Sequence, residues 1–338
     1  MSGLHGVRVL VTGGAGFIGS EVVTQLCNDG AHVTVLDNFT SGKIQYLEGV
    51  QVRIVKGDVC DESLQDVLRD QEIVFHLAAL PFIPDCYMNP SEFFKVNAMG
   101  TMNVMWEAIR SESVNKFVHV SSSEVYGTAK HVPMDENHPT LPQSTYAASK
   151  LAADRAVFTL HKEHSFPAVI IRPFNSYGPR ITQPYIVPEV ILQLLQGNRV
   201  YLGNADSSRD FTYVSDTARG IVLASVVKEA VGETINIGSG KDVKIRDLVK
   251  LTAELLGKDG DVGICYDESR LRPYDVDCLI CDYSKANKIL GWKPGVLLEE
   301  GLINTINWMK NNPVDFKEPF RGWPRVMKKN SDVRSRPS

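Results

Sequence analysis

Val7-Arg8-Val9-Leu10-Val11-Thr12-Gly13-Gly14-Ala15-Gly16-Phe17-Ile18-Gly19 is the stretch that decides the fold of this 338-residue chain. A short apolar run passes directly into glycines and then into a helical pattern, which favours a buried strand followed by a tight turn and a helix. The glycines let the backbone approach a pyrophosphate, and the helix start offers free N–H groups and the positive end of its dipole. We therefore predict a dinucleotide site that contains Gly13, Gly16, Phe17, Ile18 and Gly19.

Further apolar runs bounded by turn residues follow, and helical patterns such as 18–29 and 93–110 lie between them. These runs cover residues 32–36, 52–55, 73–77, 116–121 and 168–171. Strands that alternate with helices in this way predict an α/β fold with a doubly wound parallel sheet, the Rossmann arrangement. After Pro173 the pattern becomes irregular, which indicates a smaller α/β domain.

The predicted domain organisation follows from that change of pattern. A dinucleotide-binding domain is expected over 1–175, with a segment near 211–237 that returns to the sheet. A substrate-binding domain is expected over 176–210 and 238–325, and 326–338 reads as a polar tail.

Composition excludes several classes of function. The chain carries 43% apolar and 22% charged residues and a formal net charge of -4, so no global positive field attracts nucleic acid or a membrane. The N-terminus lacks the pattern of a signal peptide, and we expect a cytoplasmic protein. The six cysteines are scattered, and the pair Cys278 and Cys281 lacks the further ligands that a zinc site needs. No metal site is predicted.

Asp37 ends the second predicted strand and points to the cofactor. A carboxylate at this place accepts hydrogen bonds from ribose hydroxyls and repels a 2′-phosphate, which favours NAD over NADP. Asp58 follows the third strand, where it would either meet the adenine edge or cap the helix expected from Asp61. Leu77, Ala78 and Ala79 end the fourth strand with mostly small residues that let the backbone lie against the cofactor.

Tyr146 and Lys150 are the predicted catalytic pair. Their spacing places both side chains on one face of a helix, and a nearby ammonium lowers the pKa of a phenol. Such a tyrosine can take a proton from an alcohol. Ser122 follows the fifth strand, where it would hold the reacting hydroxyl, and Glu124 would take a proton from carbon. A surface pair and a loop-orienting carboxylate are the structural alternatives.

The chain resembles the extended short-chain dehydrogenase/reductase family, in particular its nucleotide-sugar epimerases and dehydratases. The resemblance rests on the glycine stretch at 12–19, Asp37-Asn38, Gly57-Asp58-Val59, His76-Leu77-Ala78-Ala79, Ser122-Ser123-Glu124-Val125-Tyr126-Gly127, Tyr146-Ala147-Ala148-Ser149-Lys150, the run from Arg172-Pro173 to Arg180, Arg209-Asp210-Phe211-Thr212-Tyr213-Val214 and Arg272-Pro273. It implies that Asn38, Val59 and Pro173 also line an NAD site, and that the chain forms a homodimer with paired helices.

The residues after the fifth strand help to sort reactions within that family. Ser123-Glu124 looks like the version found in GDP-mannose 4,6-dehydratases, and the segments around Gly203 and Arg209 resemble UDP-N-acetylglucosamine 4,6-dehydratases. The resemblance therefore implies a nucleotide-diphosphate-hexose 4,6-dehydratase. A 4-epimerase and a UDP-glucuronate decarboxylase are the rival reactions, and a non-catalytic NAD-binding regulator is the rival from another class. Ser123 departs from relatives that carry an acid at this position. Glu124 would then have to take the C5 proton of the sugar and also pass it to the leaving C6 oxygen.

The diphosphate of such a substrate needs positive partners. Arg209 and Arg272 are the candidates, since guanidinium groups match phosphate oxygens, although a surface salt bridge is the plainer interpretation of each. Asn175 would donate to a phosphate or sugar oxygen. Tyr87 lies in the segment that the resemblance assigns to the substrate loop.

Overall fold

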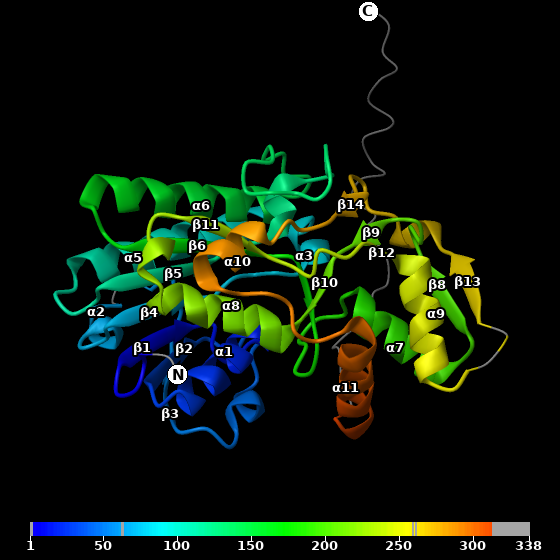
Figure 1. Cartoon of the computed structure of the whole chain (residues 1–338), viewed down its shortest axis with the longest axis horizontal. Helices are drawn as coiled ribbons and strands as arrows, with labels where there is room; N and C mark the ends of the chain where they lie inside the picture. Colours follow the sequence, from blue (N-terminus) through cyan, green and yellow to red (C-terminus); the bar gives the residue numbers. More distant parts are fainter. Residues whose placement is uncertain (1–2, 62–63, 259, 261, 313–338) are drawn as a thin grey trace, which may run out of the picture.

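A computed structural model describes residues 3–61, 64–258, 260 and 262–312 of the chain. Its centre is a seven-stranded parallel sheet with the order β11-β6-β5-β4-β1-β2-β3 (Figure 1). The strands are β1 (Arg8–Thr12), β2 (His32–Asp37), β3 (Val52–Lys56), β4 (Ile73–His76), β5 (Lys116–Val120), β6 (Ala168–Pro173) and β11 (Thr234–Ile237). The order reverses between β1 and β4, so the predicted doubly wound α/β fold is confirmed.

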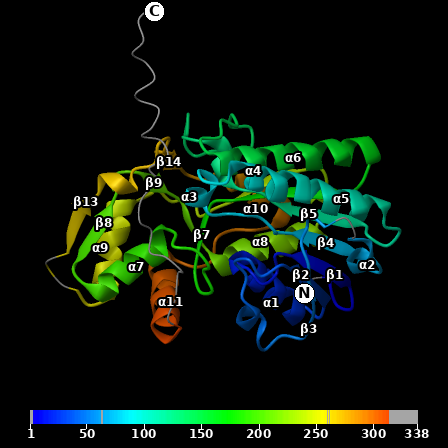
Figure 2. The same cartoon turned by 180° about the vertical axis from the view of Figure 1, so that it is seen from behind.

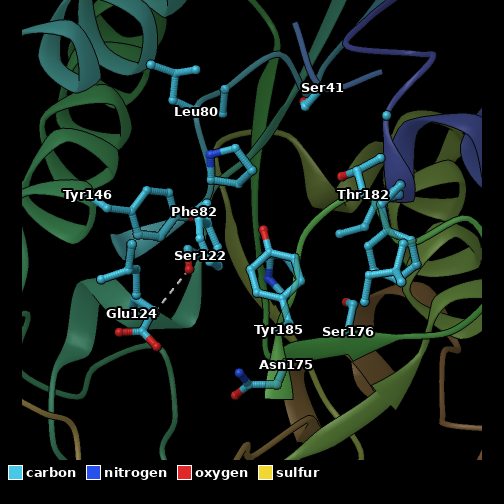
Figure 3. A pocket seen from close by; sticks show the side chains of 18 of the residues that line it. Ser41, Leu80, Phe82, Ser122, Glu124, Tyr146, Asn175, Ser176, Thr182 and Tyr185 are labelled. Carbon is cyan, nitrogen blue, oxygen red and sulfur yellow. Dashed lines mark hydrogen bonds between the residues drawn. The ribbon is translucent and has the colours of Figure 1, made fainter. Parts of the chain in front are cut away.

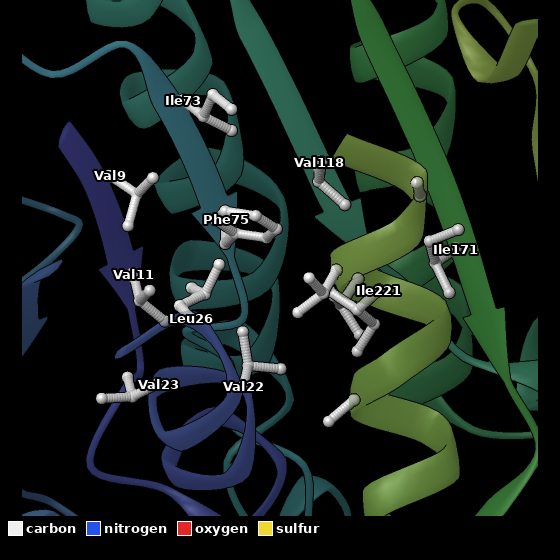
Figure 4. Close-up of a cluster of buried hydrophobic side chains, with 14 of the residues drawn as sticks. Val9, Val11, Val22, Val23, Leu26, Ile73, Phe75, Val118, Ile171 and Ile221 are labelled. Atoms are coloured by element: carbon white, nitrogen blue, oxygen red, sulfur yellow. The ribbon is translucent and has the colours of Figure 1, made fainter. Parts of the chain in front are cut away.

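Helices cover both faces of this sheet because its strands are apolar on both sides. One face packs against α1 (Phe17–Asn28), α8 (Val214–Val226) and α10 (Ser284–Leu290). The other packs against α2 (Gln65–Leu68), α5 (Gly100–Arg110) and α6 (Thr145–His164), which Figure 2 shows from behind. Figure 4 shows Leu26 of α1 and Ile221 of α8 meeting strand residues such as Phe75, all fully buried. Each such side chain contributes roughly 1.5–3 kcal/mol to folding.

The remaining elements build a second layer beside the sheet, with its own apolar cluster. Its helices are α7 (Ile186–Gln196), α9 (Ile245–Leu255) and α11 (Leu298–Asn311). Its strands pair as β13 (Gly263–Tyr266) with β8 (Arg199–Leu202), β10 (Phe211–Tyr213) with β7 (Asn175–Tyr177), and β12 (Val243–Lys244) and β14 (Cys278–Leu279) with β9 (Ser208–Arg209).

Short elements join these layers. They are η1 (Ile44–Leu47), α3 (Ile83–Cys86), α4 (Pro90–Phe93), the π-helix η2 (Phe94–Met99), η3 (Ser123–Tyr126), η4 (Lys228–Ala230) and η5 (Glu268–Arg270). Residues 93–110, expected as one helix, thus change from π- to α-helical winding at Gly100.

The chain crosses between the two layers more than once. The segment that the sequence predicted to return near 211–237 supplies β10, α8 and the edge strand β11. Helix α10 also packs against α8 and β11, although its residues fall in the range predicted for the substrate-binding domain. The domain boundaries themselves stay a prediction, and the tail at 326–338 lies outside the described residues. Within the described ranges, no helix combines the length and the apolar character that a bilayer crossing requires.

Candidate active site

A cavity of about 570 Å³ opens at the carboxyl ends of the central strands, against α7, β8 and the segment around Arg272. A ligand site at this edge of a doubly wound sheet is the general expectation for the fold. The cavity is lined by every residue that the sequence predicted for catalysis and for the cofactor. Of the four predicted substrate residues, Asn175, Arg209 and Arg272 line it, and Tyr87 is absent from its lining among the described residues.

The glycine turn fits a dinucleotide pyrophosphate. Gly13 has φ +69°, a backbone conformation that favours glycine, and a Cβ atom there would lie 2.7 Å from the backbone nitrogen of Ala78. A Cβ atom on Gly19 would run into the carbonyl oxygen of Gly13. Helix α1 begins at Phe17, and Gly16 to Gly19 line the cavity, so the helix start faces the space a phosphate would fill.

Asp37 is held in place by the backbone around the same cavity. Its Oδ2 accepts a hydrogen bond from Ala15 N at 3.0 Å, and its Oδ1 accepts one from Phe39 N at 2.8 Å. Burial raises the pKa of this carboxyl, and the two backbone donors partly oppose that rise. Nearby, Asn38 Nδ2 donates to Asp58 Oδ2 at 2.8 Å, which ties the ends of β2 and β3 together.

The predicted catalytic side chains converge at the ends of β5 and α6. Ser122 caps η3, and its Oγ accepts a hydrogen bond from Glu124 N at 3.2 Å, drawn in Figure 3. The same serine side chain is hydrogen-bonded to Tyr146. Helix α6 is started by Ser144, whose Oγ accepts from Ala147 N. Figure 3 places Tyr146, Ser122 and Glu124 on one side of the cavity.

The environment of Tyr146 differs from the sequence-based expectation. Burial raises its pKa to about 12, the hydrogen bond from Ser122 opposes this, and the negative charge of Glu124 adds to the rise. The expectation of a lowered pKa for Tyr146 is therefore wrong for the chain by itself, because burial outweighs the groups that would lower it. Lys150 is turned to the backbone, where its Nζ donates to Val120 O at 2.7 Å, and burial lowers its own pKa to about 8.

Arg209 and Arg272 share one carboxylate. Asp275 Oδ1 lies 3.6 Å from Arg209 Nη2 and 3.4 Å from Arg272 Nη1. Taken alone, these three side chains carry one more positive than negative charge, and the charge of Glu124 also acts on Arg209. Burial, and then the charge of Arg272, lower the pKa of Arg209, and an anion placed between the two groups would relieve their repulsion.

Asn175 supplies a further sign of a ligand. Its Oδ1 is buried and has no hydrogen-bond partner among the described residues, and Figure 3 shows the side chain at the cavity. An orphaned buried acceptor costs free energy, so an N–H or O–H group of a ligand at this place would be favourable.

The sequence missed the aromatic wall of the cavity. Phe82 and Tyr185 lie edge to face, with ring centroids 5.9 Å apart, and Thr182 adds a hydroxyl beside them. Figure 3 shows Tyr185 between the catalytic side and Thr182. These residues stand in irregular segments outside helices and strands, so no periodicity marked them.

Comparisons with known proteins place these features in context. The family model described as GDP-mannose 4,6 dehydratase matches residues 10–305. A putative UDP-glucose 4-epimerase of Methanocaldococcus jannaschii is 33% identical over 90% of this chain and 99% of its own length. UDP-glucuronic acid decarboxylase 1 of Xenopus tropicalis is 32% identical over 90% of this chain and 72% of its own length. The solved dTDP-glucose 4,6-dehydratase DesIV of Streptomyces venezuelae, with NAD bound, superimposes with a TM-score of 0.83 at 32% identity, covering 90% and 98% of the chains.

Proposed function

We propose, from the premise that this chain belongs to the nucleotide-sugar epimerases and dehydratases of the extended short-chain dehydrogenase/reductase family, that it is a nucleotide-diphosphate-hexose 4,6-dehydratase. Its cofactor is NAD. The observation that carries the proposal is Glu124, a carboxylate in the cavity wall that is 8% exposed and acts electrostatically on Tyr146. A 4-epimerase needs no base at C5, whereas a dehydratase does.

The residues of the cavity divide between the two ligands. The glycine turn would hold the pyrophosphate of the cofactor, and Asp37 would accept hydrogen bonds from its adenosine ribose. Arg209 and Arg272 would bind the diphosphate of the substrate, and Asn175 would pair with a polar group of the sugar. When bound, NAD would supply the hydride chemistry, as the acceptor for the hydride of C4 and the source of the hydride that C6 receives.

Proton transfers fall to the chain itself. Tyr146, hydrogen-bonded to Ser122, takes the proton of the C4 hydroxyl, and the C4 ketone makes the C5 proton acidic. Glu124 takes that C5 proton and gives it to the C6 hydroxyl, which leaves as water and forms a C5–C6 double bond. When hydride returns to C6, Glu124, reprotonated from solvent, gives a proton to C5, and Tyr146 releases the C4 hydroxyl proton to solvent. Ser123 is 3% exposed and is a poor acid at neutral pH, so Glu124 performs both transfers.

A product assay tests the proposal. The protein is incubated with UDP-, GDP-, dTDP- and CDP-hexoses, N-acetylated hexoses and UDP-glucuronate, and the products are weighed. We expect loss of one water from a hexose substrate. Loss of carbon dioxide would mean a decarboxylase, and an isomer of unchanged mass would mean an epimerase, and either result would refute the dehydratase.

Asp37→Ala is expected to weaken NAD binding about 10- to 100-fold, the cost of a lost hydrogen bond to a charged group. The same variant should narrow the preference of the chain for NAD over NADP, because a carboxylate repels the 2′-phosphate. Asp37→Asn is the matched control, because it keeps the shape of the side chain. It should reduce the preference for NAD over NADP and lose less NAD affinity than Asp37→Ala. Titration calorimetry measures both cofactors. Equal affinity of the unsubstituted chain for NAD and NADP would contradict this role of Asp37.

We further propose that the chain is a homodimer, as its resemblance to the family implies. Met99, Met102 and Trp106 of η2 and α5 and Phe158 of α6 are exposed apolar side chains on the two packed helices. The chain should sediment as a dimer at micromolar concentration, and Trp106→Glu with Phe158→Glu should shift it toward the monomer, because charges would be buried between the copies. Tyr266→Glu, at an exposed apolar residue of β13, is the control and should leave the dimer intact. A monomeric parent would refute the proposal.

A further inference from the structure

A buried cluster of ionisable side chains lies behind Lys150 and is not used by the steps above. Asp154 follows Lys150 by four residues on α6, so the two side chains share one face of the helix. Asp154 is fully buried, and Arg172 Nε of β6 donates to its Oδ2 at 2.9 Å. On the other side, His119 Nε2 of β5 lies 3.4 Å from Asp154 Oδ1.

The remaining members of the cluster carry no charge of their own at neutral pH. Burial lowers the pKa of His119 to about 4 and holds the pKa of His76 well below its usual value, so both imidazoles are neutral. The two ring nitrogens of His76 contact the hydroxyls of Thr12 and Thr101 at 2.8 and 2.9 Å. Burial raises the pKa of Tyr126, whose hydroxyl accepts from Arg172 Nη1 at 2.9 Å.

The charge of Lys150 depends on a single carboxylate of this cluster. The groups that interact electrostatically with Lys150 are Asp154 from α6, His76 from β4 and His119 from β5. Arg172 from β6 joins the cluster through Asp154, and Tyr126 from η3 joins it through Arg172. Asp154 is the carboxylate of this set, and its charge raises the pKa of Lys150. A guanidinium does not lose its proton in proteins, so Lys150 is the basic group of this cluster that can become neutral.

We propose that Asp154 is a positioning residue, which keeps the amine of Lys150 charged and in place behind the catalytic Tyr146. The hydrogen bond from Lys150 Nζ to Val120 O fixes where this ammonium stands but adds no charge. Asp154 supplies the negative charge, and Arg172 fixes the orientation of that carboxylate. This inference rests on the proposed proton transfer by Tyr146, because a charged Lys150 stabilises the phenolate that the transfer forms.

The effect of Asp154 on Lys150 has a definite sign. Burial lowers the pKa of Lys150, and the charge of Asp154 raises it. Loss of Asp154 therefore lets Lys150 lose its proton at a lower pH, and activity that needs the ammonium should fall off at a lower pH. A residue that only supports the fold would change stability and rate without moving this pH limit.

The test follows the amine of Lys150 directly in the full-length chain. Acetic anhydride labels unprotonated amines, and peptide mass spectrometry over a pH series gives the labelling midpoint of Lys150. We expect a midpoint at about 8 in the parent, from the lowered pKa of Lys150. In Asp154→Asn the midpoint should move down by about one pH unit, the scale for loss of a nearby opposite charge. The pH above which sugar turnover declines, the alkaline limb of the pH profile, should move down by a similar amount.

Two further variants serve as a safeguard against misfolding and as a control. Asp154→Asn leaves Arg172 without its counter-ion, so the double variant Asp154→Asn with Arg172→Gln removes both charges and should fold if the single variant does not. The labelling midpoint of Lys150 in this double variant should also move down, because the charge of Asp154 acts on Lys150, whereas Arg172 contacts Asp154 and Tyr126. Asp216→Asn is the matched control, since Asp216 is a buried carboxylate that pairs with Arg219 and accepts from Gly295 N and Val296 N. Its substitution should lower stability and leave the Lys150 midpoint unchanged.

The outcomes separate this inference from the proposed function. The inference is overturned if the labelling midpoint of Lys150 is the same in the parent, in Asp154→Asn and in the double variant. A midpoint that moves while the alkaline limb of turnover stays overturns the positioning role. A parent that converts no nucleotide sugar counts against the proposed function, and the labelling midpoint then still decides whether Asp154 holds the charge of Lys150.

Discussion

Tyr146→Phe is expected to reduce turnover of the nucleotide sugar by about 10²- to 10⁴-fold, the range for loss of a general acid–base group. The phenol oxygen is the group that takes the C4 hydroxyl proton, and Ser122, its hydrogen-bond partner, has no strong basicity of its own. The substitution removes one oxygen from a side chain that is 9% exposed and whose ring packs edge to face against Phe93 at 6.4 Å. The fold and the cofactor site should therefore survive, which thermal unfolding and NAD titration would verify.

The matched control is Tyr213→Phe, because Tyr213 is half-buried and is not among the residues that line the cavity. It should turn over substrate at close to the parental rate. If Tyr146→Phe turned over substrate within a few-fold of the parental rate, Tyr146 would not be the base for the C4 hydroxyl. The first step that the dehydratase and epimerase mechanisms share would then be refuted as written.

Local sequence patterns predicted the parts of this site that depend on neighbours in the chain. The glycine turn and Asp37 stand at the ends of β1 and β2, and the apolar runs located both strands. Ser122 and Tyr146 were found in the same way, from a strand end and a helical spacing. Parallel pairing of β1, β4 and β5 then places these strand ends at one edge of the sheet.

Contacts between distant segments could not be predicted in this way. Arg209 and Arg272 share Asp275 because β9 pairs with β14, and nothing in either short segment signals that pairing. Tyr185 reaches the cavity from an irregular segment before α7, where no period constrains the side chain. The unusual pKa of Tyr146 also depends on burial by the whole fold, so the spacing to Lys150 alone predicted the wrong direction.

Glu124→Gln should separate the two halves of the proposed reaction. Tyr146 and Ser122 remain, so C4 oxidation should continue, whereas removal of the C5 proton should slow by roughly 100-fold or more, the usual scale for a general base. The substitution keeps the size of the side chain, and the backbone N–H of residue 124 can still donate to Ser122 Oγ. The variant should therefore accumulate a 4-keto sugar that has not lost water, which mass spectrometry after trapping of the ketone would detect.

Solvent deuterium gives the second measurement. In deuterated water the parent should place deuterium at C5 of its product, because Glu124 passes the original C5 proton to the leaving water and then gives C5 a deuteron from solvent. Glu124→Gln should lose most of that exchange. Glu136→Gln is the control: the Oε1 of this half-buried carboxyl accepts from Asn236 N, and Glu136 is not among the residues that line the cavity, so exchange at C5 should persist. A C4 epimerase exchanges nothing at C5 and tolerates the loss of Glu124. If the parent converts a hexose substrate and the product carries no deuterium at C5, the dehydratase assignment is refuted and the epimerase assignment is favoured.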